Sequence, residues 1–138
     1  MFFETGLITV EIPDNVTSLG KETFKYCYYL QKAIIGDGVT TLGYGTFWAC
    51  GNLTTVELGD RLETIGEGAF KNCSKLASLT IPSSVSRIEN YAFISASNLK
   101  SVQFNGTKEQ WGSINRYYYW NYDAYIEKVV CTNGTVKI

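Results

Sequence analysis

The chain has 138 residues, of which 45% are hydrophobic, and this suits one domain with a core of useful size. Lysine and arginine number 12 against 13 aspartates and glutamates, which gives a net charge of -1, and neither sign forms a long run. Nucleic acid and membrane partners are therefore not expected, and no membrane insertion is predicted.

A unit of 23 residues repeats along the chain. Leucine recurs at five evenly spaced positions, and phenylalanine and cysteine recur in the same frame. The columns are Leu7, Leu30, Leu53, Leu76 and Leu99; Phe24, Phe47, Phe70 and Phe93; and Cys27, Cys50 and Cys73, with Ala96 in the fourth cysteine position. Because no unit of this size can bury its own apolar face, the units must stack around a shared core.

Each unit is predicted to contain a strand, a turn, a second short strand and a helical turn, in that order. The first segment alternates apolar and polar residues, as in 76–81, and a turn rich in Pro, Gly and Asp follows it. Residues 39–42 illustrate the second strand, and residues 67–73 the helical turn. The predicted fold is a right-handed solenoid of parallel strands over residues 1–104, with repeats that start near 7, 30, 53, 76 and 99.

The C-terminal segment 105–138 is predicted to cap this array within the same structural domain. A capping box at Thr107 and Gln110 predicts a short helix over 108–114. Residues 125–138 are predicted to form a β-hairpin around an Asn-Gly turn. Helix and hairpin together would close the end of the solenoid.

The order Leu-x-x-Val-x-Ile-Pro, Val-x-x-Leu-Gly and Thr-Phe-x-x-Cys in residues 7–27 resembles the 23-residue leucine-rich repeats of BspA-like bacterial surface proteins. It recurs at 30–50, 53–73 and 76–96, and the Gly-Thr…Trp element within 105–111 is similar to the element that closes such arrays. The resemblance implies surface display, adhesion to host matrix proteins or other cells, and no catalysis. It identifies no ligand contact, because the shared motif consists of core residues.

The N-terminus has no basic segment, sustained apolar stretch or small-residue cleavage site, so a signal peptide is not predicted. Thr5-Gly6 fits the end of an earlier repeat, which would place Met1 in the phenylalanine column. A natural start would leave an uncapped apolar end at Leu7, an edge that is prone to pair with another chain. We therefore expect a fragment of a longer exported chain, extracellular or at the cell surface; the expectation is cytoplasmic if Met1 is the natural start.

No catalytic residue, cofactor or metal is predicted. The chain has no histidine, which removes the usual general base, the usual metal ligand and every histidine-dependent triad. The cysteine column is predicted to consist of buried apolar thiols, since thiolate metal sites use local Cys-x-x-Cys pairs. Asp14, Asp37 and Asp60 form a row that could attract a cation, but turn-forming aspartates explain the row better.

Two outward ladders between the buried strand positions form the first candidate binding surface. Their hydroxyl, amide and isolated charged groups suit a protein or a glycan, and the alternative is a plain solvated sheet. The residues of this ladder face are Thr9, Glu11, Lys32, Ile34, Thr55, Glu57, Ser78, Thr80, Ser101 and Gln103.

An aromatic run in the cap forms the second candidate surface. Tyrosine and tryptophan supply large rigid contact areas with a polar tip, which suits sugars or peptides. The alternative is that these rings seal the exposed end of the core, with one or two of them left exposed. The cap aromatics are Tyr117, Tyr118, Tyr119, Trp120 and Tyr122.

The sequence thus favours a non-enzymatic recognition module that binds a protein, or a glycan, and exists as a monomer or with weak end-to-end association. A structural spacer with no ligand of its own is the alternative. A solenoid polysaccharide-degrading enzyme is the least favoured function. A lyase needs a cluster of cations and bases on one face, whereas Lys32 and Lys100 lie three repeats apart.

Overall fold

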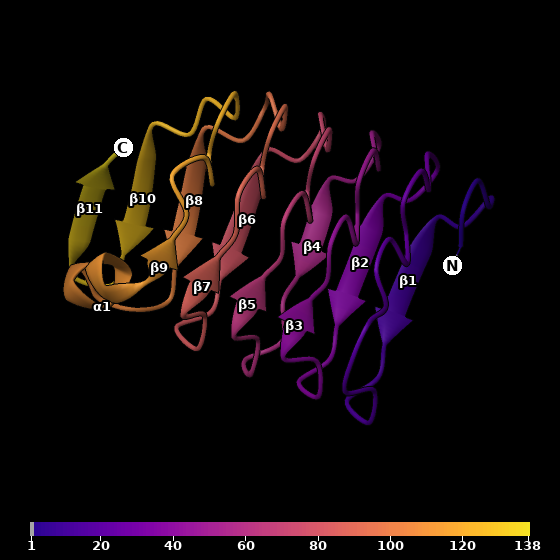
Figure 1. The fold of residues 1–138 in the computed structure, drawn as a ribbon, viewed down its shortest axis with the longest axis horizontal. Coiled ribbons are helices and arrows are strands. Elements are labelled where there is room, and N and C mark those ends of the chain that lie inside the picture. Colours follow the sequence, from indigo (N-terminus) through magenta and orange to yellow (C-terminus); the bar gives the residue numbers. More distant parts are fainter. Residues whose placement is uncertain (1) are drawn as a thin grey trace.

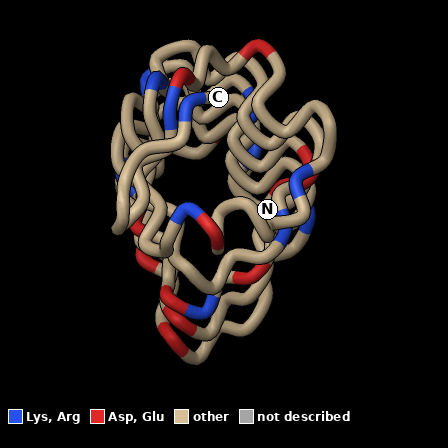
Figure 2. The backbone as a smooth tube through the Cα atoms, turned by 90° about the vertical axis from the view of Figure 1, so that its left-hand side faces the viewer, with Lys and Arg blue, Asp and Glu red and all other residues tan. Residues whose placement is uncertain are grey.

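The computed structural model describes residues 2–138, and the expected place of Met1 in the phenylalanine column lies outside the described residues. The chain winds into a solenoid whose coils stack along one axis (Figure 1). Viewed along that axis, residues of both charges are distributed around the coil (Figure 2). The predicted class of fold, a repeat solenoid of parallel strands, is confirmed.

Four successive coils, those of β2, β4, β6 and β8, each contribute one strand to a long face and one short strand to a second face. The long-face strands are β1 (Thr9–Ile12), β2 (Lys32–Ile35), β4 (Thr55–Glu57), β6 (Ser78–Ile81), β8 (Ser101–Phe104), β10 (Lys128–Cys131) and β11 (Gly134–Lys137). The short strands are β3 (Thr41–Leu42), β5 (Thr64–Ile65), β7 (Arg87–Ile88) and β9 (Asn115–Arg116). Thr9 pairs with Lys32, and Lys32 with Thr55, so the sequence period is also the strand register.

The long face divides into two sheets. Strands β1, β2 and β4 form a three-stranded sheet, and β6, β8, β10 and β11 form a four-stranded sheet. The short strands form one sheet in the order β3, β5, β7, β9, which crosses the division. The second face therefore ties the two halves of the long face together.

Phenylalanine rings stack through the middle of the solenoid. Phe24, Phe47, Phe70 and Phe93 are fully buried, and successive ring centroids lie 5.4, 5.6 and 5.5 Å apart. At the N-terminal end, the ring of Phe2 lies 5.3 Å from that of Phe24. The described residue that extends the column is thus Phe2, one position after the predicted one. Stacked rings of this kind add to the free energy of burial.

The segment after each short strand forms single hydrogen-bonded turns, where the sequence analysis predicted helical turns. Within 67–73, the amides of Lys71 and Cys73 donate to carbonyls three residues earlier. The amides of Phe70 and Asn72 donate instead to backbone carbonyls of the next coil. Residues with positive φ recur at two positions per repeat and prevent a helix. They are Glu22, Gly45, Gly68 and Tyr91 at the first position, and Tyr26, Ala49, Asn72 and Ser95 at the second.

The cap contains the predicted elements and continues the solenoid path. Helix α1 (Lys108–Ser113) begins with the predicted capping box and buries Trp111. Strand β9 pairs with β7, and β10 pairs with β8 before it forms the antiparallel hairpin with β11. Strand β10 starts three residues later than predicted because Tyr125 has a φ of +54°, which lies outside the range of strand residues. The division into an array over 1–104 and a cap over 105–138 stays a prediction.

Replacing Phe70 by alanine should lower the free energy of unfolding by about 3–5 kcal/mol, because the ring is buried between two others and its loss leaves a cavity. Chemical denaturation followed by circular dichroism measures this change. Tyr29→Ala, at a side chain that is 63% exposed, is the control and should change the value by about 0.5 kcal/mol or less. A loss below about 1 kcal/mol at Phe70 would contradict the stacked core.

Candidate functional site

The ladder-face residues lie outward on the long face, and each of them is exposed or half-buried. Those on β1, β2 and β4 form one in-register group, and those on β6 and β8 form another. Lys32 Nζ lies 3.0 Å from Glu57 Oε1, so two of these residues form an exposed ion pair. The structure therefore brings the predicted residues together as two adjacent groups and not as one continuous row.

A hollow of about 200 Å³ lies where the two sheets of the long face meet. Glu57 and Asp60 line it from one side, and Thr80, Pro82 and Asn105 line it from the other. Two predicted ladder residues, Glu57 and Thr80, thus border a notch that a partner's side chain can enter. The notch follows from the division between β4 and β6, which the repeat period does not reveal.

The cap aromatics separate into buried and exposed rings. Trp120 is 7% exposed and meets Phe93 and Trp111 edge to face, with ring centroids 6.1 and 5.6 Å away. It closes the phenylalanine column, which agrees with the capping alternative for this one ring, and a buried ring offers little surface to a partner. Three of the five cap aromatics stay exposed, where that alternative left one or two exposed. Tyr118 is 86% exposed. Tyr119 and Tyr122 are also exposed, and Tyr117 is half-buried beside Arg87.

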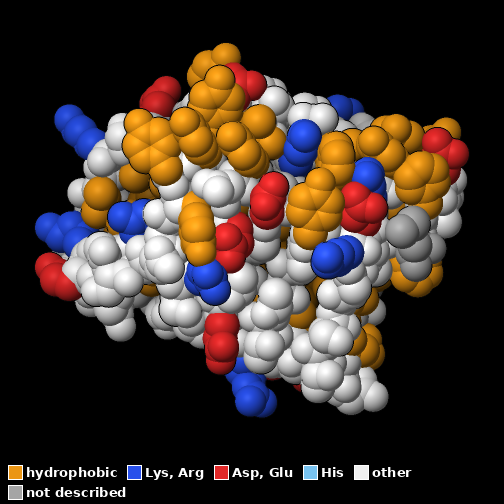
Figure 3. Space-filling view, in the orientation of Figure 1, with side chains coloured by type: hydrophobic (Ala, Val, Ile, Leu, Met, Phe, Trp, Pro, Cys, Tyr) orange, Lys and Arg blue, Asp and Glu red, His pale blue; other side chains and the backbone are white. Residues whose placement is uncertain are grey.

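The structure adds an aromatic edge that the sequence analysis did not predict. Hydrophobic side chains gather along the upper edge of the molecule, over the turns that follow the short strands (Figure 3). Their rings contact one another in two groups. The N-terminal group consists of Phe3, Tyr26, Tyr28, Tyr44 and Trp48, and the C-terminal group consists of Tyr91, Tyr118, Tyr119 and Tyr122.

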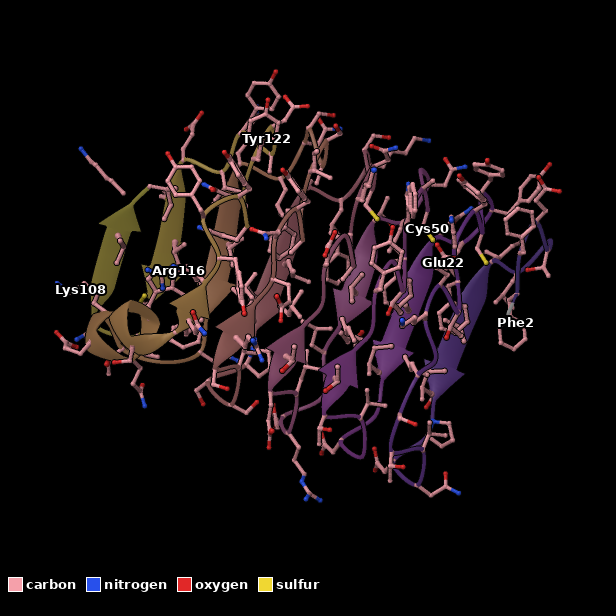
Figure 4. The ribbon with its side chains drawn as sticks, in the orientation of Figure 1. Phe2, Glu22, Cys50, Lys108, Arg116 and Tyr122 are labelled. Carbon is pink, nitrogen blue, oxygen red and sulfur yellow. The ribbon has the colours of Figure 1, made fainter. Side chains whose placement is uncertain are left out.

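A hollow of about 370 Å³, here called the aromatic hollow, separates the two groups of rings. Tyr44 and Trp48 line one side of it, and Tyr91 and Tyr122 line the other, where Tyr122 projects from the edge (Figure 4). Glu67, Gly68, Lys71 and Ile94 complete the lining. The volume falls within the range of small-ligand sites.

The aromatic hollow depends on a glycine in one repeat column. Gly68 stands where neighbouring coils place Glu22, Gly45 and Tyr91. Its φ of +62° is close to the +56° of both Glu22 and Tyr91, so the backbone is alike and only the side chain differs. A Cβ at Gly68 would meet nothing nearer than Lys71 Cβ at 3.8 Å, which shows that the space above it is open.

Contacts with the Trp48 ring and one ion pair hold the charged side chains around the aromatic hollow in place. Lys25 and Lys71 place their ammonium groups 3.9 and 4.3 Å from the centre of the Trp48 ring, within cation–π distance. Lys25 also donates to Glu22 at 2.6 Å, and this hydrogen bond raises the pKa of Lys25. Within residues 2–138, neither Glu67 nor Lys71 takes part in a salt bridge. The hollow thus contains one carboxylate without a salt bridge and one ammonium that rests on the Trp48 ring.

The cysteine column consists of buried thiols, as predicted. Cys50 Sγ donates to the carbonyl of Phe24 at 3.0 Å, and Cys73 Sγ donates to that of Phe47 at 3.1 Å. Burial raises the pKa of Cys50 to about 12 and raises the pKa of Cys73 well above its usual value. Because the thiolate is the nucleophile, these protonated thiols are poorly reactive.

The aspartate row supports its turns. The amide of Asp37 donates to Asp14 Oδ1 at 2.9 Å, and that of Asp60 donates to Asp37 Oδ1 at 2.7 Å. These bonds fit the turn-forming interpretation of the row. Over residues 2–138, no group of three or more His, Cys, Asp or Glu side chains is placed to hold a metal ion. Within the same range, no helix has the length and apolar character needed to cross a membrane.

Comparison with known proteins identifies a family and several similar structures. The family profile described as the BspA type leucine rich repeat region matches residues 1–125 in six copies. No curated protein matches the chain.

Three bacterial proteins of known structure share the fold. The pneumococcal vaccine antigen PcpA has a TM-score of 0.72 and 20% identity, over 91% of this chain and 30% of that one. A leucine-rich repeat protein from Bacteroides ovatus has a TM-score of 0.63 and 24% identity, over 96% and 44%. A leucine rich cell surface protein from Faecalibacterium prausnitzii has a TM-score of 0.52 and 28% identity, over 78% and 34%. The chain therefore spans less than half the length of each of these proteins.

Alkylation of the native protein at pH 8 should label Cys50 and Cys73 last. A thiol with a pKa of about 12 is ionised at that pH in roughly one molecule in ten thousand. Mass spectrometry after timed treatment with iodoacetamide measures the order, and denatured protein should label at all four cysteines. Labelling of Cys73 at the rate of the denatured protein would contradict the buried column.

Proposed function

The chain belongs to the BspA-type leucine-rich repeat family, and from this premise we propose that it is the recognition module of a bacterial cell-surface or secreted protein. Its proposed role is to bind a protein partner, on a host matrix or on another cell, without catalysis. The observation that supports this role is the ladder face, where outward side chains on neighbouring strands lie in register and remain accessible.

The ladder face suits a protein partner for two physical reasons. Parallel strands spaced by about 4.8 Å present hydroxyl, amide and charged groups on a rigid surface, so binding orders few additional groups. The notch beside Glu57 and Thr80 offers a place for a partner's side chain at the centre of this face. Central pockets of this kind are where binding energy concentrates in protein interfaces.

The absence of histidine supports a non-enzymatic role, as do the protonated, buried thiols. Export to the cell surface is part of the proposal and agrees with the family and with the Faecalibacterium cell surface protein.

A spacer that carries other domains is the second candidate. It is favoured by the unbroken phenylalanine stack and by the β3–β5–β7–β9 sheet, which make the coils one stiff unit.

Replacing Lys32, Glu57 and Thr80 together by alanine should weaken binding to a protein partner by about tenfold or more, because the change removes contacts on both sides of the notch. The partner is first sought by surface plasmon resonance on immobilised matrix proteins, and the wild type and variants are then titrated against it. Tyr118→Ala, at an exposed cap ring, is the matched control and should bind normally.

Both variants must melt at the wild-type temperature, which excludes a stability effect. An identified partner that binds the triple variant with unchanged affinity would refute the ladder face as the site. A screen that finds no partner at high protein concentration would instead favour the spacer.

A further inference from the structure

We propose that the aromatic hollow binds one pyranose ring of a neutral glycan. This site lies outside the ladder face and does not depend on it, since none of its lining residues belongs to a long-face strand. The inference rests on the spacing of the rings, on the charges between them and on the open space above Gly68.

The two aromatic sides leave room for a ring between them. Tyr44 and Tyr91 come from coils two steps apart, and two strand spacings amount to about 9.6 Å. A ring that touches an aromatic group on each side needs about 7–8 Å, since non-bonded carbon atoms pack at about 3.5–4.0 Å, so a saccharide ring can enter this space. Its two faces carry C–H groups, which gain dispersion contacts with the tyrosine on either side that the ring rests against.

The charges between the two sides give no net attraction to an ionic ligand. An anion or a cation in the aromatic hollow would meet one group of like charge and one of opposite charge, Glu67 and Lys71, so little offsets the cost of removing the ion from water. A neutral polyhydroxyl ligand satisfies both groups, because its hydroxyls donate to the carboxylate and accept from the ammonium. The combination of aromatic faces with one hydrogen-bonding group of each charge is thus matched by a sugar.

The rings are held in position before a ligand arrives. Tyr44 lies edge to face with Trp48, their centroids 6.1 Å apart, and Tyr91 stacks on Tyr119 at 5.4 Å. Even so, Tyr44 remains 40% exposed and Tyr122 remains 55% exposed. Rings that are fixed by their neighbours and still exposed lose little entropy on binding, which favours affinity for a small ligand.

The test begins with a microarray of neutral, anionic and cationic oligosaccharides probed with the whole 138-residue chain. Neutral gluco-, galacto- and manno-oligosaccharides should bind, and sialylated, uronate-containing and glucosamine oligomers should bind more weakly by about tenfold. The best neutral oligosaccharide is then titrated by isothermal calorimetry against the wild type and the variants.

The deciding variant is Gly68→Tyr, which fills the aromatic hollow. The same column already holds Tyr91 at a φ of +56°, so the backbone accepts this side chain. Asn72→Tyr is the matched control: it adds the same side chain to the same coil, at a φ of +59° in a column that contains Tyr26, and lies outside the lining. Gly68→Tyr should lower affinity by about a hundredfold, and Asn72→Tyr should leave it unchanged.

Glu67→Gln and Lys71→Gln test the charges, and each should lower affinity by about tenfold while the melting temperature is kept. If Gly68→Tyr fails to fold, Tyr44→Ala and Tyr122→Ala replace it, since both residues are exposed. Glu57→Ala on the ladder face should leave glycan binding intact, which separates this site from the proposed protein surface.

Three outcomes would overturn the proposal. The first is that no neutral oligosaccharide binds at millimolar concentration, and the second is that only charged oligosaccharides bind. The third is that Gly68→Tyr, or the two tyrosine variants used in its place, bind the neutral oligosaccharide with wild-type affinity. If a protein partner loses affinity for Gly68→Tyr while no oligosaccharide binds the wild type, the aromatic hollow is a protein site and not a glycan site.

Discussion

The stack of buried phenylalanine rings is the contact on which the rest of the solenoid depends. Each ring fixes the position of its coil against the next. The backbone carbonyls of Phe24 and Phe47 also accept hydrogen bonds from the thiols of Cys50 and Cys73. The residue after each phenylalanine points outward, which places Trp48 and Lys71 side by side on the aromatic edge. The packing of the core therefore sets the positions of the side chains that line the aromatic hollow.

The period of 23 made the fold predictable, because leucine, phenylalanine and cysteine each recur at one depth in the core. The same regularity hid three features. Phe2, and not Met1, extends the column, because one residue fewer separates Phe2 from Phe24 than separates the later phenylalanines. The left-handed turns were missed because several are occupied by residues other than glycine, such as Ala49 and Tyr91. The break between β4 and β6 occurs at repeat positions that look equivalent in the sequence.

The two candidate surfaces also differ in how far the sequence predicts them. The ladder face was predictable, because outward positions of a strand follow directly from the inward ones. The aromatic hollow was not, because it arises from differences between repeats: glycine at 68 where Tyr91 stands one coil later, and tryptophan at 48 between two lysines. A column-by-column search for a missing side chain beside aromatic residues would have found it. Trp120 was ambiguous for another reason, since the same ring serves as a cap or as a contact and only its burial decides.

The matched register of the coils has a genetic consequence. A deletion of residues 53–75 removes one period, so Phe47 would meet the equivalent ring of Phe93, and the register of the strands would be kept. Recombination between copies of the repeat can therefore change the length of such an array while the fold survives. The aromatic hollow has no such tolerance, because Glu67, Gly68 and Lys71 would be lost in that one step. Length and binding specificity would then evolve at different rates, the first by exchange of whole units and the second by point substitution within them.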